Sequence, residues 1–181
     1  SHDFISPLKR DSAACKRCHD GTPAELRARV IELQEKNLGM LIDAGYRTAT
    51  VAKLIERADA SIDPMAPDVR PRYEMAARFY RQALYRVIYM GAENSVGFHN
   101  PAEGERILGD AAYYATEADK TLRALLADKG VSVPAEVPLE LRSYLDGRGT
   151  HKQDFKPAHY IPDPTGNAQK NWPASLGALL R

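Results

Sequence analysis

The sequence predicts a mainly α fold: a short cysteine-containing segment, three long antiparallel helices and an extended, proline-rich C-terminal tail. Three observations predict it. Apolar residues between 23 and 130 recur near the 3.6-residue period of a helix, two proline-containing capping signals mark helix starts, and half of the 12 prolines fall from Val131 onward. We expect residues 1–22, 23–130 and 131–181 to be these three parts of one domain.

The composition of the chain argues against a nucleic-acid-binding protein and against a membrane-spanning one. The 181 residues are enough to bury one sizeable core. With 25 Lys+Arg against 24 Asp+Glu, the net charge of +1 argues against a protein whose main task is to neutralise nucleic-acid phosphates. No apolar run approaches the roughly 18 residues of a membrane span, and no leader pattern opens the chain. We expect any export signal to lie outside this sequence.

Both cysteines of the chain stand in the segment Cys15-Lys16-Arg17-Cys18-His19. The pattern Cys-x-x-Cys-His is typical of c-type haem attachment. Two thiols at this spacing can bond the two vinyl groups of the porphyrin, and the next side chain, His19, can then ligate the iron. Covalent haem attachment indicates a compartment outside the cytoplasm, such as a periplasm.

Other interpretations of the two cysteines compete with haem attachment. A thioredoxin-like redox pair needs a preceding strand, and residues 7–12 do not have a strand pattern. A zinc site needs about four ligands, and no second Cys/His pair at finger spacing exists. A structural disulfide across two intervening residues is unusual. Haem attachment is the prediction that we retain.

The first helix is predicted from the segment Thr22-Pro23-Ala24-Glu25. Thr22 is a good N-cap, Pro23 suits the first helical position, and Glu25 can complete a capping box. We predict one long helix over 23–60, with Gly39 or Gly45 as the places for any irregularity. Its predicted apolar stripe is Leu26, Val30, Leu33, Leu41, Ala44, Ala52, Ile55 and Ala58.

Two further helices follow. One begins after Pro71, and the next begins at Asn100-Pro101 and stops at Lys129-Gly130. Short connections between long amphipathic helices predict an antiparallel array. The stripes suit packing beside a flat apolar cofactor, and an ordinary bundle core explains most of them equally well. They are Tyr73, Ala76, Ala77, Tyr80, Leu84, Val87, Ile88 and Gly91, then Ile107, Leu108, Ala111, Ala115, Ala118, Leu122 and Leu125.

The tail is predicted to run extended, with at most one short helix near 138–146, because closely spaced prolines disfavour a helix. Its two histidines, His151 and His159, are not expected to ligate iron.

His99 is the other candidate iron ligand. It stands in the turn between the second and third helices, directly before a helix cap, which would hold its ring in one place. The alternative is a histidine that only makes hydrogen bonds within the turn. His2 lies in a segment without helical or strand periodicity.

Taken in order, these motifs resemble the C-terminal part of ammonia-forming cytochrome c nitrite reductases, the pentahaem family, and of related octahaem nitrite reductases. The resemblance covers roughly residues 1–133, and its combination of His2, the haem motif and the His99 hairpin is far more specific than the haem motif alone. The matching residues are His2, Ser6-Pro7-Leu8, Cys15-Lys16-Arg17-Cys18-His19, and residues 97–104, 106–109 and 125–130.

The resemblance implies a multihaem cytochrome c and a role for each matched residue. Cys15 and Cys18 would attach one haem c, whose iron has His19 as an axial ligand. His2 and His99 would be axial ligands of two other haem irons. The haem of this chain would pass electrons toward a catalytic haem held outside it, in an enzyme that reduces nitrite to ammonia.

The resemblance also implies a periplasmic homodimer formed through the long helices, a companion haem-bearing portion, and a quinol-linked or cytochrome electron donor. The catalytic residues of the family precede the matched region, so none is expected in this chain. Calcium belongs to the family too, with its ligands outside this chain. We therefore expect a fragment, a cleaved product or a separate subunit of a larger assembly, or a relative that kept only this module.

Two other functions remain open on sequence grounds. The chain could be a stand-alone monohaem electron carrier with His19 and His99 on one iron. It could also be an assembly or dimerisation module whose haem is a structural clamp.

Overall fold

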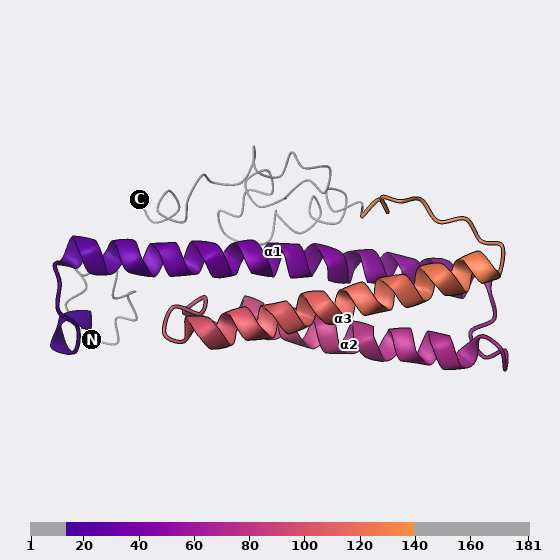
Figure 1. Cartoon of the computed structure of the whole chain (residues 1–181), viewed down its shortest axis with the longest axis horizontal. Helices are drawn as coiled ribbons and strands as arrows, with labels where there is room; N and C mark the ends of the chain where they lie inside the picture. Colours follow the sequence, from indigo (N-terminus) through magenta and orange to yellow (C-terminus); the bar gives the residue numbers. More distant parts are fainter. Residues whose placement is uncertain (1–13, 140–181) are drawn as a thin grey trace, which may run out of the picture.

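The computed structural model describes residues 14–139, which form an all-α array without strands in that range (Figure 1). A short 3₁₀ turn, η2 (Cys15–Arg17), precedes three antiparallel helices: α1 (Pro23–Ser61), α2 (Arg70–Ala92) and α3 (Pro101–Asp128). α3 packs against both other helices, and the contact between α1 and α2 is smaller. The mainly α class and the three long helices predicted from the sequence are confirmed.

The array has two unlike ends. At the closed end, the α1–α2 connection (residues 62–69) meets the last turn of α3 (Figure 1). The open end holds residues 15–22, the first turns of α1 and, set back from them along the long axis, the α2–α3 turn (residues 93–100). α1 has 39 residues, against 23 in α2 and 28 in α3, so its first turns extend past the α2–α3 hairpin.

Local chemistry sets the ends of α1. The Thr22 hydroxyl accepts a hydrogen bond from the Glu25 N–H at 3.3 Å, and the Glu25 carboxylate accepts one from the Thr22 N–H at 2.8 Å. This is the predicted capping box. The same carboxylate has a lowered pKa, chiefly because it accepts the Thr22 backbone and hydroxyl hydrogen bonds. The helix is continuous through Gly39 and Gly45, and it ends one residue later than predicted.

The ends of α2 and α3 follow their proline and glycine signals. α2 begins at Arg70, with Pro71 in its first turn. Asn100 caps α3 by accepting a hydrogen bond from the Glu103 N–H. At the other end, Gly130 takes a positive φ of 71° and donates its N–H to the Ala127 carbonyl at 2.9 Å. The stop predicted at Lys129-Gly130 is therefore confirmed.

The hydrophobic core lies toward the closed end. Small and aliphatic side chains from all three helices meet there with almost no exposed surface. They are Val51, Leu54, Ala58, Ala76, Ala83, Ala115, Ala118, Leu122 and Leu126.

The predicted stripes agree best on α3. Ala111, Ala115, Ala118, Leu122 and Leu125 of that helix are all buried, as is Leu108. On α2 the prediction is wrong for Ile88, which is 60% exposed, and for Gly91, which is also exposed, because the helix turns Ala83 and Met90 toward its neighbours instead. On α1 the predicted Leu26, Leu33, Leu41, Ala52 and Ile55 are only partly buried. Val51 and Leu54, which the prediction did not include, are buried there.

Residues 131–139 leave α3 without helix or strand and run back along α1 (Figure 1). The Arg123 guanidinium donates to the Pro134 and Ala135 carbonyls at 2.8 and 3.2 Å, which holds this segment against the array. Val131, Val133 and Val137 add apolar contacts to the core. The rest of the predicted tail, with the helix expected near 138–146, lies outside the described residues from 140 onward.

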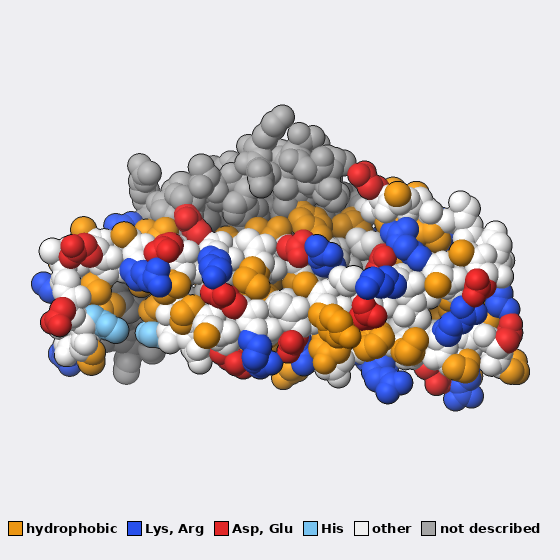
Figure 2. Space-filling view, in the orientation of Figure 1, with side chains coloured by type: hydrophobic (Ala, Val, Ile, Leu, Met, Phe, Trp, Pro, Cys, Tyr) orange, Lys and Arg blue, Asp and Glu red, His pale blue; other side chains and the backbone are white. Residues whose placement is uncertain are grey.

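Charged side chains of both signs are interspersed over the visible face of the array (Figure 2). None of the described helices is both long and apolar enough to cross a membrane.

Candidate haem site

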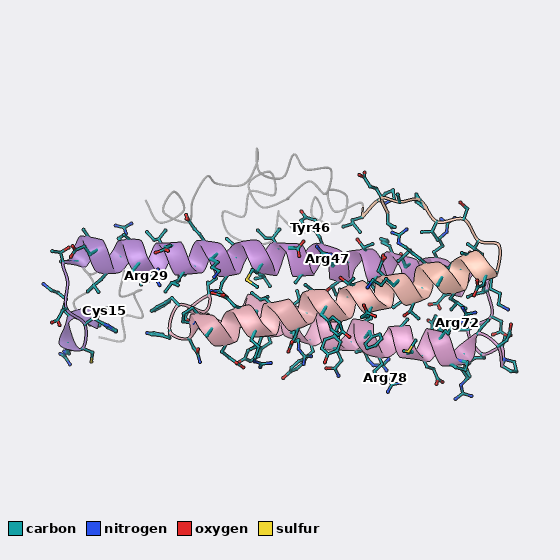
Figure 3. All side chains as sticks on the ribbon, in the orientation of Figure 1. Cys15, Arg29, Tyr46, Arg47, Arg72 and Arg78 are labelled. Carbon is teal, nitrogen blue, oxygen red and sulfur yellow. The ribbon has the colours of Figure 1, made fainter. Side chains whose placement is uncertain are left out.

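The two cysteines lie on a single tight turn beyond the start of α1 (Figure 3). The N–H groups of Cys18 and His19 both donate to the Cys15 carbonyl, at 3.1 and 3.0 Å. Cys15 is partly buried, while Cys18 and His19 are exposed. Two thiols and one imidazole therefore stand on one short turn, with Cys18 and His19 accessible from solvent.

The donor set of this turn fits haem c. Both cysteines are free thiols, which the disulfide alternative would not predict. Thioether attachment needs two accessible thiols at this spacing and an adjacent imidazole, all of which are present. Within residues 14–139 no group of three or more His, Cys, Asp or Glu side chains is arranged to hold a metal ion by itself, which the zinc alternative would require.

The α2–α3 turn, which contains His99, is fixed by one carboxylate. Glu93 accepts hydrogen bonds from the Ser95 N–H, the Ser95 hydroxyl and the Gly97 N–H, each at 2.8 Å. Partial burial alone would raise the pKa of Glu93, but these hydrogen bonds, with a smaller effect of His99, lower it below the ordinary value. Val96 at φ 50° and Gly97 at φ 78° take left-handed backbone conformations inside this turn. A β-branched residue such as Val96 keeps this conformation only where its surroundings determine it, whereas glycine adopts it without strain.

The turn is also docked onto α1. The Gln34 side-chain amide donates to the Ser95 carbonyl at 2.9 Å, and Lys36 pairs with Glu105 of α3 at 2.7 Å. The ring of His99 lies against that of Phe98, with centroids 4.0 Å apart. His99 is nevertheless exposed. A rigid turn thus presents an accessible imidazole, which is the geometry that an axial ligand needs.

The structure brings the haem motif and His99 to the same end of the array. His19 precedes the start of α1, and His99 lies in the α2–α3 turn at the same end of the antiparallel array. Figure 2 shows pale blue histidine surface at this end. The other three, His2, His151 and His159, lie outside the described residues. The predicted ligand role of His2 is therefore not tested by the structure.

Two features of this end escaped the sequence prediction. Gln34 and Asn37 are buried polar residues on α1, where the predicted stripe contained only apolar residues. Their side chains lie one helical turn apart, and a three-residue spacing of amides was the available signal. The second feature is an exposed apolar stripe on α2 made by Tyr85, Ile88 and Tyr89, which leads into the turn at Glu93 along a groove of about 370 Å³.

The chain matches one protein family and is similar to proteins with two different names. A family model described as cytochrome c552 matches residues 1–175. The protein named cytochrome c nitrite reductase subunit NrfA, from Nitratidesulfovibrio vulgaris strain Hildenborough, is 30% identical over 120 residues, which is 65% of this chain and 23% of that protein. The protein named cytochrome c-552, from Bacteroides fragilis strain YCH46, is 30% identical over 138 residues, 76% of this chain and 27% of its own length. The chain thus spans about a quarter of these curated relatives.

Proposed function

Since this chain belongs to the cytochrome c552 family, whose members are multihaem cytochromes c, we propose that it is the C-terminal haem-binding portion of a multihaem nitrite reductase. Its own task would be to hold one haem c for electron transfer toward a catalytic haem outside this chain. The observation that carries the proposal is the single turn from which Cys15, Cys18 and His19 all project. When bound, haem c supplies a one-electron redox centre.

Each side chain of the site has a proposed role. The thiols of Cys15 and Cys18 would bond the porphyrin covalently, and the imidazole of His19 would ligate its iron. His99 would ligate the iron of a second haem, attached outside this chain, and the Glu93-centred turn would hold its ring in place. His2, by its place in the sequence, is the ligand of a third.

The reaction of the whole assembly is proposed to be reduction of nitrite to ammonia in the periplasm, with its catalytic residues outside this chain. The printed name of the N. vulgaris relative supports nitrite as the substrate. We propose that the remaining haem-bearing portion, a second copy docked through the long helices, and a quinol-linked or cytochrome donor are its partners. The exposed stripe on α2 supports a partner, because large contiguous apolar surface is usually covered. Calcium, where present, would bind that remaining portion.

We propose three functional parts in one domain. Residues 1–22 attach haem, residues 23–130 form the helical array, and residues 131–181 form the tail. The capping box at Thr22 and the stop at Gly130 support the two boundaries.

The attachment site is tested by the mass of the intact chain from a host that attaches c-type haem. We expect one covalent haem on the wild-type chain and none on the Cys15→Ala/Cys18→Ala double variant. Lys16→Ala is the matched control, because it changes the same turn without removing a thiol, and it should retain the haem. A wild-type chain without added haem mass, or loss of haem in the control, would contradict the proposal.

A second candidate, the stand-alone monohaem electron carrier, is favoured by one observation: the segment that ends in His19 and the α2–α3 turn that contains His99 lie at the same end of the array. In that case both imidazoles would ligate one iron, and His99→Ala would convert the haem of this chain from low to high spin.

The two candidates separate in a double-variant experiment on the assembled protein. His99→Ala is measured by electron paramagnetic resonance with and without the Cys15→Ala/Cys18→Ala change. If His99 ligates the iron of another haem, His99→Ala produces a high-spin signal both with and without the Cys15→Ala/Cys18→Ala change. If His99 and His19 ligate one iron, His99→Ala produces that signal only where Cys15 and Cys18 are intact.

A further inference from the structure

Asn37 is a buried amide without an obvious structural reason. It lies on α1, is 1% exposed, and donates its Nδ2 to the Leu33 carbonyl of its own helix at 3.1 Å. Its Oδ1 has no hydrogen-bond partner in the part of the chain that the structure describes. A buried carbonyl oxygen without a partner lowers stability, so an apolar side chain of similar size would suit the fold better.

Two glycines on either side of His99 close around this amide. A Cβ on Gly104, in the first turn of α3, would lie 2.6 Å from the Asn37 Oδ1. A Cβ on Gly97, in the α2–α3 turn, would lie 3.0 Å from the same side-chain amide. Gly97 also takes a φ of +78°, so it is suited to glycine in both space and backbone conformation. The Asn37 amide therefore occupies the room that two side chains would need.

We propose that Asn37 is a positioning residue for His99: wedged between Gly97 and Gly104, it fixes the distance of the histidine turn from α1. Gln34, one turn earlier, holds the other side of the same turn through the Ser95 carbonyl. α1 begins directly after the Cys15–His19 segment. α1, which starts close to the proposed haem-attachment segment, thus positions the imidazole of His99, the proposed ligand of a second haem iron. This inference rests on the proposed role of His99 as an iron ligand.

The test uses the assembled multihaem protein and three readouts: the electron paramagnetic resonance signal of the haem that His99→Ala disturbs, the midpoint potential of that haem, and the thermal melt. With Asn37→Ala we expect the low-spin signal of that haem to broaden, with the appearance of a high-spin fraction and a shifted potential. Thr48→Val is the matched control: Thr48 is a buried polar residue of α1 whose hydroxyl donates to the Ala44 carbonyl of its own helix. It should leave the signal and the potential unchanged.

A rescue experiment separates positioning from loss of stability. Gly104→Ala adds a methyl group that meets the Asn37 Oδ1, so it should displace the turn and lose more of the low-spin signal than Asn37→Ala. The double variant Asn37→Ala/Gly104→Ala removes the clash and should regain part of that signal. Should Gly104→Ala not assemble, Asn37→Ala and its control decide the question alone.

The outcomes distinguish the inference from the function on which it rests. If His99→Ala changes no haem signal, the ligand role of His99 fails, and the positioning role fails with it. If His99→Ala changes one haem but Asn37→Ala matches the Thr48→Val control, only the positioning role is overturned. Equal loss of every haem signal in Asn37→Ala would make Asn37 a folding residue and would also overturn the inference.

Discussion

α1 buries aliphatic side chains at one end of the helical array and amide side chains at the other. Toward the closed end, α1 buries Val51, Leu54 and Ala58 against aliphatic side chains of α2 and α3. Toward the open end it buries Gln34 and Asn37, whose amides face the α2–α3 turn. The same secondary structure therefore serves as a core element at one end and as a support for a turn at the other.

The closed end is also tied by polar contacts between segments. Arg72 of α2 pairs with Asp128 of α3, Lys129 pairs with Asp68 of the α1–α2 connection, and Tyr73 bonds Asp59 of α1. At the open end the haem motif and His99 are exposed instead. We therefore expect the free energy of folding to come mainly from the closed end, while the open end keeps the haem motif and His99 accessible.

Leu122→Ala tests this division with the largest expected effect. Leu122 has no exposed surface and lies in the core of the closed end. Removing its side chain should lower the free energy of unfolding by about 2–5 kcal/mol, from lost burial plus the cavity left behind. Leu26→Ala, a partly buried leucine on the extended first turns of α1, is the control and should lose clearly less. Urea denaturation followed by circular dichroism measures both, and equal losses would contradict the comparison.

Thr22→Ala tests the open end, where α1 extends past its neighbours and depends on its own cap. Loss of the capping box should cost about 0.5–2 kcal/mol locally. The expected result is faster hydrogen exchange in the first turns of α1, with the amides of the closed end unchanged. Thr121→Val removes a hydroxyl that donates to the Glu117 carbonyl of its own helix, and it should leave this exchange unaltered. Protection of the first turns that survives Thr22→Ala would show that packing, not the cap, holds them.

The helix ends were predictable because they depend on local chemistry. The Thr22 capping box, the Asn100 cap and the Gly130 stop each involve residues within a few positions of one another, so the sequence contains the whole interaction. The family was predictable from the order of motifs, and the match to the cytochrome c552 model over residues 1–175 confirms it.

Which residues of each helix are buried was less predictable, because this depends on how the neighbouring helices pack against it. Ile88 fits the helical period of α2, yet Ala83 and Met90 are buried and Ile88 is exposed. Gln34 and Asn37 were missed because a search for apolar periodicity excludes amides. Their partners, Ser95, Gly97 and Gly104, lie some sixty residues away along the chain, and only the fold brings them together.

Tyr73→Phe probes the closed end through its pH dependence. Burial first, then the hydrogen bond to Asp59 and its charge, raise the pKa of Tyr73 from 10.0 to about 12. Because the folded pKa lies above the unfolded one, this contribution is complete below pH 10 and is lost as the pH rises toward 12. The variant should lose about 0.5–1.5 kcal/mol at neutral pH. Denaturation midpoints across this alkaline window should fall more steeply for wild type than for Tyr73→Phe, and parallel curves would contradict the assignment.

The smallest expected effect concerns two exposed ion pairs, one at each end of the array. Arg72 and Asp128 lie 2.5 Å apart and join α2 to α3 at the closed end, with side chains 38% and 60% exposed. Arg29 and Glu32 lie 2.6 Å apart within α1 at the open end and are more exposed still. Exposed pairs contribute only about 0.2–1 kcal/mol.

Arg72→Ala should therefore lower the free energy of unfolding slightly, and Arg29→Ala should lower it less. The reason is that Arg72–Asp128 joins α2 to α3, which separate on unfolding, whereas Arg29–Glu32 lies within α1. Added salt should remove the difference between the two variants, since screening weakens both pairs. Denaturation at low and high salt measures it. If Arg29→Ala lowers the free energy of unfolding at low salt more than Arg72→Ala does, the open end contributes more to folding than its exposed, polar side chains indicate.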